Sequence, residues 1–266
     1  MLKVRLIPVL YLMNGQIVRS ESFSKFQTIG NPLNELGRFS EWRVDELVYA
    51  DITRQGEHVA RSIDQPVKGM TDTLSVLREI SRLAFMPLTF GGRIDNPETA
   101  EIYILNGADK VLINTACYRT PSIVGDVSRT HGSQAMVAGM DIKRVDGKLT
   151  LWIDQARIPV EDDPVEYAKK LEGLGAGEIL VNSIDRDGMG EGYDIAAVRE
   201  IADAVSIPVV AAGGAGFFDD FVDIVRNGHA SAAAAGNIFH FTEHSYKRAK
   251  KTMKANGLDV RFPYAS

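Results

Sequence analysis

Two pairs of glycine residues are the first feature of this sequence that could do chemistry. Gly91-Gly92 and Gly213-Gly214 each follow a short apolar run. Glycine has no Cβ, so its backbone N–H can approach an anion closely, and a following helix N-terminus adds partial positive charge. Such glycines can also form nothing more than tight turns. Because the pairs occupy equivalent places in an internal repeat, we expect them to bind phosphate.

Other polar residues follow further apolar runs and extend this pattern. Asn114-Thr115 comes after one run and Gly236-Asn237 after another. Hydroxyl, amide and backbone groups at such positions are typical of phosphate sites. One more polar pair in a position of this kind is Asp187-Gly188.

Two carboxylates end apolar runs and could act in proton transfer. Asp141 ends the run that begins at Met136, and Asp51 ends an earlier one. A carboxylate at such a point could serve as a general base, although capping a helix or pairing with a loop cation would explain it equally well. The first apolar run ends differently, with Tyr11 and no carboxylate.

The elements that must position these residues are short apolar runs alternating with helix-like segments. Eight strand–helix units predict a parallel sheet with helices outside, and eight units close naturally into a barrel. The sequence therefore predicts an α/β fold, a (β/α)₈ TIM barrel, as a single domain over 1–266. The expected strands are Val4–Val9, Glu46–Ala50, Pro87–Phe90, Lys110–Ile113, Met136–Met140, Glu178–Val181, Pro208–Ala211 and Ala232–Ala235.

Helix signals separate these strands. Asn96 and Asp163 each precede a proline, which places a capping residue before the first helical turn. Glycines end several helical segments, where a left-handed residue is expected. These glycines are Gly107, Gly175 and Gly228. The expected helices are Thr73–Leu83, Pro97–Leu105, Pro164–Leu174 and Ile195–Ala204.

An internal half-barrel repeat supports the barrel. Phe90-Gly91-Gly92 recurs as Ala212-Gly213-Gly214 nearly half a chain later. In such a barrel the active site lies at the C-terminal ends of the strands. The glycine pairs would then lie on opposite sides of the barrel mouth.

Four charged residues mark the other end of the barrel. Glu46, Lys110 and Glu178 open alternate strands, and Arg5 lies at nearly the same height on the first strand. Residues of equal height on alternate strands share one layer inside a barrel, so the four should meet. Buried charges are tolerated when they are paired. Two interpretations stay open: a salt-bridged plug, or a polar gate to a passage through the barrel.

Composition limits the class of protein. The chain has 266 residues and a net charge of −5, which argues against nucleic acid as the main partner. No apolar run reaches membrane-spanning length and the N-terminus has no signal-peptide pattern, so we expect no membrane partner and a cytoplasmic location. One cysteine, Cys117, and scattered histidines predict no metal site, and nothing indicates a cofactor.

The sequence resembles HisF, the family of cyclase subunits of imidazole glycerol phosphate synthase. The resemblance covers essentially the whole chain. The matching blocks are Arg5–Pro8, Asp45–Val48, Asp51–Thr53, Gly107–Val111, Ile113–Ala116, Gly132–Ala135, Asp141–Val145, Gly175–Leu180, Ser183–Gly188, Ala212–Gly216 and Phe239–Phe241.

The resemblance implies a lyase-type enzyme that acts with a glutaminase subunit docked on the N-terminal barrel face. That partner releases ammonia, which passes through the barrel to a phosphorylated small-molecule substrate. The family's ammonia gate would consist of Arg5, Glu46, Lys110 and Glu178, and Asp141 falls on a catalytic aspartate. The implied phosphate contacts are Gly91, Gly92, Asn114, Thr115, Asp187, Gly188, Gly213 and Gly214.

Several positions depart from the family pattern. The family's other catalytic aspartate, at the end of the first strand, is Tyr11 here. A tyrosine is a poor substitute because its reference pKa is about 10, whereas that of aspartate is about 3.9. Arg19 stands where the family has a loop lysine that contacts substrate. Further departures are Met13 for a lysine, Arg93 for a third glycine, Asn237 for a serine and a long loop over 54–69.

These departures make the chain similar to HisF-like paralogues found with genes for surface polysaccharides such as lipopolysaccharide. Those paralogues are proposed to amidate a sugar nucleotide with ammonia from a glutaminase-like partner. We favour this interpretation. Two alternatives remain: an authentic subunit for histidine biosynthesis with a substituted acid, and a non-catalytic subunit that binds a phosphometabolite and a partner.

Overall fold

The structure, a computed structural model, describes residues 3–53, 72–241 and 244–263; the long loop over 54–69 lies outside them. Within the described residues, parallel strands close into a barrel because β10 pairs with both β11 and β7. The (β/α)₈ prediction is therefore correct. The barrel strands are β1 (Arg5–Met13), β4 (Leu47–Asp51), β5 (Leu88–Gly91), β6 (Lys110–Ile113), β7 (Met136–Val145), β10 (Glu178–Ser183), β11 (Val209–Ala212) and β12 (Ala232–Ala235).

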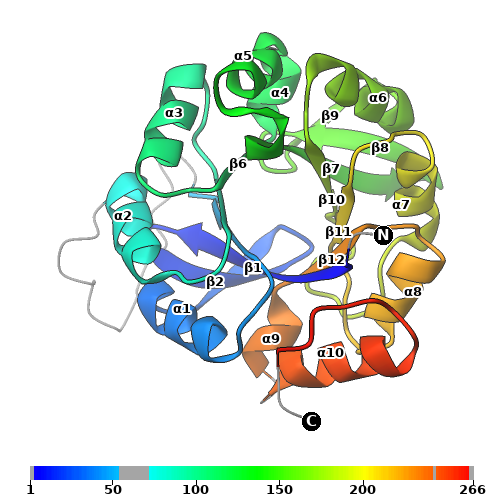
Figure 1. Cartoon of the computed structure of the whole chain (residues 1–266). Helices are drawn as coiled ribbons and strands as arrows, with labels where there is room; N and C mark the ends of the chain where they lie inside the picture. Colours follow the sequence, from blue (N-terminus) through cyan, green and yellow to red (C-terminus); the bar gives the residue numbers. More distant parts are fainter. Residues whose placement is uncertain (1–2, 54–71, 242–243, 264–266) are drawn as a thin grey trace.

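Helices surround the strands and follow one another around the barrel in chain order (Figure 1). Each covers the outside of the sheet with its apolar residues, which is why the helical spacing was visible in the sequence. They are α1 (Pro32–Glu41), α2 (Thr73–Leu83), α3 (Pro97–Leu105), α4 (Thr115–Arg119), α5 (Ser122–His131), α6 (Pro164–Leu174), α7 (Ile195–Ala202), α8 (Asp220–Arg226), α9 (Asn237–Phe241) and α10 (Ser245–Ala255). No helix among the described residues is long and apolar enough to cross a membrane.

The capping residues act as expected, with one exception. Asn96 accepts a hydrogen bond from Thr99 N at 2.8 Å, and Asp163 caps α6. Gly175 ends α6 with φ 107°. Gly228 is not left-handed, and the prediction was wrong there. His229 instead takes the positive φ of 56°.

Two antiparallel hairpins extend from the mouth of the barrel, and the sequence reading missed both. β1 continues to Met13 and turns into β2 (Gln16–Glu21) and β3 (Lys25–Gly30); β7 continues to Val145 and turns into β8 (Lys148–Ile153) and β9 (Ile158–Val160). The signals were present as Asn14-Gly15 and Asp146-Gly147, because two residues with positive φ form the turn that suits a two-residue hairpin.

The apolar residues form two main cores. The larger lies between the sheet and the helices, and its biggest members include Tyr49, Phe39, Phe221 and Tyr246. The smaller fills the barrel interior with aliphatic side chains. It consists of Ile7, Val9, Val48, Val137, Leu180, Val210, Ala212, Ala232 and Ala234, with Tyr11 and Leu112 packed against it.

Candidate active site

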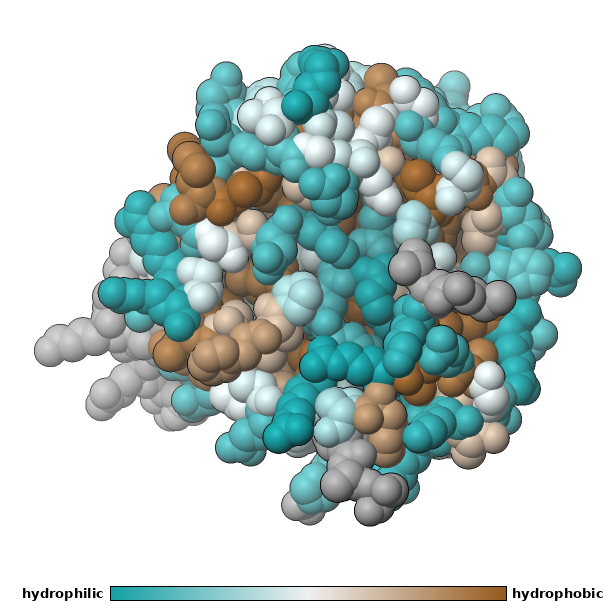
Figure 2. Space-filling view, in the orientation of Figure 1, coloured by the Kyte–Doolittle hydropathy of each residue, from teal (hydrophilic) through white to brown (hydrophobic). Residues whose placement is uncertain are grey.

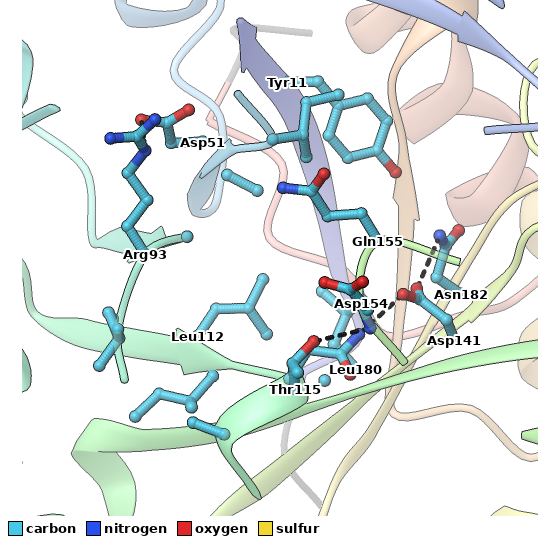
Figure 3. Close-up of a pocket in the computed structure, with 18 of the residues that line it drawn as sticks. Tyr11, Asp51, Arg93, Leu112, Thr115, Asp141, Asp154, Gln155, Leu180 and Asn182 are labelled. Carbon is cyan, nitrogen blue, oxygen red and sulfur yellow. Dashed lines mark hydrogen bonds and ion pairs between the residues drawn. The ribbon is translucent and has the colours of Figure 1, made fainter. Parts of the chain in front are cut away.

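A cavity of about 560 Å³ opens at the C-terminal ends of the barrel strands (Figure 3). Its wall combines residues from the ends of β1, β4, β6, β7 and β10 with residues from the turn between β8 and β9. Tyr11, Asp51, Asn114 and Asp141, all expected from the sequence, line this one space. A barrel mouth with several converging polar groups is the expected place for chemistry.

Asp141 lies at the floor of the cavity and is held by two amides. Asn114 Nδ2 donates to its Oδ2 at 2.8 Å, and Asn182 Nδ2 donates to its Oδ1 at 3.2 Å. Burial raises the pKa of Asp141 to about 6, although the two amides act in the opposite direction by stabilising the ionised form. A carboxylate with such a pKa can take and return a proton near neutral pH.

Tyr11 lies on β1 and lines the same cavity as Asp141. Its ring packs edge-on against Phe23 of the β2–β3 turn, with the ring centroids 5.3 Å apart. Burial, and then the negative charges of Asp187 and Asp141, raise the pKa of Tyr11 well above its usual value. The hydroxyl is therefore neutral at physiological pH. It can donate a hydrogen bond, but it cannot replace a carboxylate as a base.

Asp187 is a second buried carboxylate beside this centre. Burial and the nearby charge of Asp141 raise the pKa of Asp187 to about 7. Its Oδ2 atom is buried and has no hydrogen-bond partner among the described residues. Asp187 does not line the cavity as the structure stands. Its role as a phosphate contact stays a prediction, and its raised pKa adds a proton-binding group close to Tyr11 and Asp141.

Asp51 is tied into the wall of the cavity. Its Oδ1 accepts from the Thr53 N–H at 2.8 Å, and its Oδ2 accepts from the Thr73 hydroxyl. Arg93 Nε lies 3.5 Å from the same Oδ2. Arg93, which replaces a family glycine, thus stands at the cavity with a positive φ of 58°.

The first glycine group consists of Gly91 and Gly92, and Gly92 lines the cavity. Gly92 has φ 95°, and a Cβ there would collide with the backbone of Asp51, so only glycine fits. Its carbonyl accepts from the Tyr103 hydroxyl at 3.2 Å, which fixes the turn after β5. Thr115 opens α4 and lines the cavity beside Gly92. Gly91 ends β5 and packs closely on Leu112 of β6.

The second glycine group, which consists of Gly188, Gly213, Gly214, Gly236 and Asn237, does not line the described cavity. Asn237 Nδ2 donates to the Ser20 carbonyl at 2.9 Å, and Gly188 packs against the same carbonyl. Gly213 has φ 84° and approaches Asn182 Oδ1 so closely that its Cβ would lie 3.0 Å away. The other two members also lie in close backbone contacts. Gly214 packs on Gly192, and Gly236 packs on Val9.

Arg19 does not reach the cavity. It lies on β2, where its Nε donates to Gln27 Oε1 at 2.7 Å and its guanidinium lies 3.5 Å from Glu21. Both partners belong to the same hairpin. The residue expected to contact substrate is therefore held along the hairpin in this structure.

The four charged residues at the bottom of the barrel meet as predicted. Arg5 pairs with Glu46 at 2.6 Å and with Glu178, and Lys110 Nζ lies 2.9 Å from both carboxylates. Thr89 donates a further hydrogen bond to Glu46 at 2.8 Å. Burial alone would raise the pKa of Glu46, but the charges of Lys110 and Arg5 bring it below its usual value. Glu46 is thus held in its ionised form by the two cations beside it.

Sequence reading missed two kinds of residue in the site. Asn182 is the lateral neighbour of Asp141 between β10 and β7, and it could have been found because it also follows an apolar strand core. Asp154, Gln155 and Arg157 come from the β8–β9 hairpin, which was itself not expected. Without that hairpin these residues could not be placed at the mouth.

Comparison with known proteins agrees with this geometry. The family model described as "Histidine biosynthesis protein" matches residues 5–245. The chain is also 38% identical, over 261 residues, to the imidazole glycerol phosphate synthase subunit HisF of Chlorobium luteolum, an alignment that covers 98% of this chain and 100% of that protein. The barrel, the aspartate within β7 and the charged ring thus belong to a member of the histidine biosynthesis protein family that is related to HisF subunits along its whole length.

Proposed function

We propose that this chain is the ammonia-accepting subunit of a two-protein synthase that amidates a sugar nucleotide in surface-polysaccharide biosynthesis. A glutaminase subunit supplies the ammonia at the N-terminal face of the barrel. The acceptor binds by its phosphates at the C-terminal mouth. Asp141 acts there as the general base. The sugar-nucleotide acceptor is suggested by the resemblance to HisF-like paralogues.

The observation that carries this proposal is Tyr11 in the cavity that Asp141 also lines. Ring closure in the resembling cyclases uses a carboxylate at each of these two positions. Here one of the two is a neutral hydroxyl on a large ring that packs against Phe23. One base is enough for the proton transfer when ammonia attacks an acceptor carboxyl group that ATP has activated, and the activating phosphate then leaves, so this step needs no second carboxylate beside Asp141.

An ammonia route is supported by the composition of the barrel interior. Arg5, Ile7, Val9 and Tyr11 alternate along β1 and all face inward. Tyr11 lies six positions along β1 from Arg5 of the charged ring, a distance of about 20 Å at about 3.3 Å per residue. The interior between them is aliphatic. Such a lining suits neutral ammonia and disfavours ammonium.

Docking of a partner is supported by apolar side chains on the N-terminal side of the barrel. Leu83 ends α2, Phe85 precedes β5 and Leu105 ends α3, and these are 50%, 92% and 74% exposed. Figure 2 shows brown side chains where Figure 1 places α3. Exposed apolar patches of this kind mark interaction surfaces.

A second candidate function is that of an authentic imidazole glycerol phosphate synthase subunit. The observation that favours it is the full-length similarity to a curated HisF. Asp187 could then supply the second acid, since it lies beside Tyr11 and binds a proton near pH 7.

Complementation separates the two candidates. We expect that a bacterial strain lacking its own HisF will not grow without histidine when it carries this chain. Tyr11→Asp restores the second carboxylate and should restore some growth, whereas Tyr11→Phe is the matched control and should not. Robust growth with the unmodified chain would reject the sugar-amidation proposal in favour of histidine biosynthesis.

A further inference from the structure

The turn between β8 and β9 has an unusual backbone. Asp154, Gln155 and Ala156 have φ values of 57°, 56° and 61°. None of them is glycine, and side chains other than glycine rarely adopt this left-handed backbone. Three in succession persist only when the surroundings hold them, and such backbone is concentrated at ligand-binding sites.

Contacts on both sides hold this turn. The Asp154 N–H donates to Thr115 Oγ1 at 2.9 Å, so the turn is fixed to the start of α4. Arg157 closes it from the other end, since its guanidinium lies 2.9 Å from the Asp154 carboxylate and its Nε donates to the Asp154 carbonyl at 3.0 Å. Ala156 packs with Tyr11 in the small apolar cluster at the mouth. The turn is therefore a fixed part of the cavity wall.

The Gln155 side chain uses this turn to enter the cavity. Figure 3 shows its amide directed inward from the hairpin, on the side of Tyr11. Its Oε1 atom is buried and has no hydrogen-bond partner among the described residues. Buried polar atoms are nearly always paired in proteins, so this oxygen points to a ligand that donates a hydrogen bond.

We propose that Gln155 is a specificity-determining residue that hydrogen-bonds the uncharged glycosyl part of the substrate, through a hydroxyl or acylamino N–H group. The proposal deepens the proposed function, because it assigns a part of the acceptor to a part of the same cavity.

The chemistry of the wall favours a glycosyl group over phosphate at this point. Gln155 is neutral, and its free carbonyl oxygen would repel a phosphate oxygen. Arg157, the cation nearest in sequence, is paired with the Asp154 carboxylate, and the other arginines of the cavity, Arg93 and Arg119, belong to other elements. Beside Gln155 stands the Tyr11 ring, and an aromatic face next to a neutral amide is a suitable lining for a sugar.

Calorimetric binding with three probes tests this assignment: UDP-N-acetylglucosamine, ribose 5-phosphate and inorganic phosphate. Gln155→Leu keeps the size of the side chain and removes its hydrogen bonds. Gln155→Asn withdraws the amide from the cavity and suits a left-handed turn, so it guards against a folding defect. Gln134→Leu is the matched control, because Gln134 is exposed and lies before β7 at the opposite end of the barrel.

We expect both Gln155 variants to weaken the two glycosyl probes roughly 10- to 100-fold, the loss that follows when a buried hydrogen bond is left unmade. Binding of inorganic phosphate should not change, and Gln134→Leu should bind every probe like the unmodified chain. The inference is overturned if the glycosyl probes bind without dependence on Gln155, if all probes weaken equally, or if the unmodified chain binds neither glycosyl probe. Glycosyl binding that needs Gln155 but leads to no nitrogen transfer would uphold the inference and reject only the proposed function.

Discussion

Asn182 Nδ2 lies 3.2 Å from Oδ1 of Asp141, and the two residues are direct neighbours across β10 and β7. Together with the hydrogen bond from Asn114 on the other carboxylate oxygen, this contact stabilises the ionised form of Asp141 against the effect of burial. The balance places the pKa of Asp141 at about 6. The pKa of Asp141 is thus lowered by Asn182, a neighbour that is not itself ionisable.

Removing this neighbour should shift the pH dependence of catalysis. Ammonium-driven turnover of the unmodified chain should rise with pH through about 6 as Asp141 ionises. Asn182→Leu should move that rise to higher pH by about 1–2 units, since a hydrogen bond to a charged group contributes roughly 1.5–3 kcal/mol. A pH–rate profile measures the shift. Asn34→Leu, at an exposed position of α1, is the control. An unchanged profile in Asn182→Leu would show that Asp141 is not the titrating base.

The buried charge of Asp141 should also lower the free energy of unfolding at neutral pH. Because its pKa is raised from 3.8 to about 6, the folded protein binds this proton more tightly than the unfolded chain. Stability therefore falls as pH rises through this window, and the full cost is present above it. Asp141→Asn should raise the free energy of unfolding at pH 8 by about 1–3 kcal/mol while it lowers turnover about 10²–10⁴-fold.

Urea denaturation at pH 8 and again at pH 4 checks the assignment. The gain should nearly vanish at pH 4, where the carboxyl group is protonated in the folded protein. A gain of equal size at both pH values would mean that the effect arises from packing and not from the buried charge.

The barrel could be predicted because its strands and helices follow simple periodicities. Residues such as Asp141 and Gly92 could be placed because the ends of parallel strands meet at one edge. The hairpins could not be predicted from a search for one strand per unit. They extend barrel strands past the mouth, so Gln155 and Arg157 reach the cavity from a segment that looked like an ordinary loop.

Most contacts between individual side chains also could not be predicted from the sequence. Arg19 matched a family position, yet the structure places it along β2 with Gln27 and Glu21 among its partners. Asp187 matched a phosphate contact, and its burial close to Tyr11 and Asp141 raises its pKa. The pairing of the charged ring, in contrast, follows from equal height on alternate strands, and it was predicted correctly.

Anion binding should divide between the two glycine groups. Crystals grown in sulfate should contain an ion at Gly92 and Thr115, which line the open cavity, and another at Gly213-Gly214 near Gly236. Difference density at both places checks the prediction. Empty loops at high sulfate, or N–H groups that point away from the mouth, would leave these glycines as turns required only by close packing.

The charged ring distinguishes a plug from a gate. Glu46→Ala leaves Arg5 and Lys110 short of a partner, so it should lower the free energy of unfolding by about 3–5 kcal/mol in either case. If the ring gates ammonia, the variant should also change the ratio of glutamine-driven to ammonium-driven turnover, because free ammonia can enter from the open mouth. Glu79→Ala, which breaks an exposed ion pair with Arg82, is the control. A ratio that stays constant in Glu46, Lys110 and Glu178 variants would identify the ring as a plug.

We expect this barrel to transfer ammonia nitrogen to a sugar nucleotide, and isotope incorporation measures that transfer directly. The chain would be incubated with ¹⁵N-ammonium, a panel of sugar nucleotides, and ATP to activate a carboxyl group on the acceptor. The imidazole glycerol phosphate precursor would be supplied in parallel. We predict ¹⁵N in the glycosyl part of a sugar nucleotide, found by mass spectrometry, and its loss in Asp141→Asn. Label in an imidazole product with every sugar nucleotide unlabelled, or no label in any acceptor, would contradict the account.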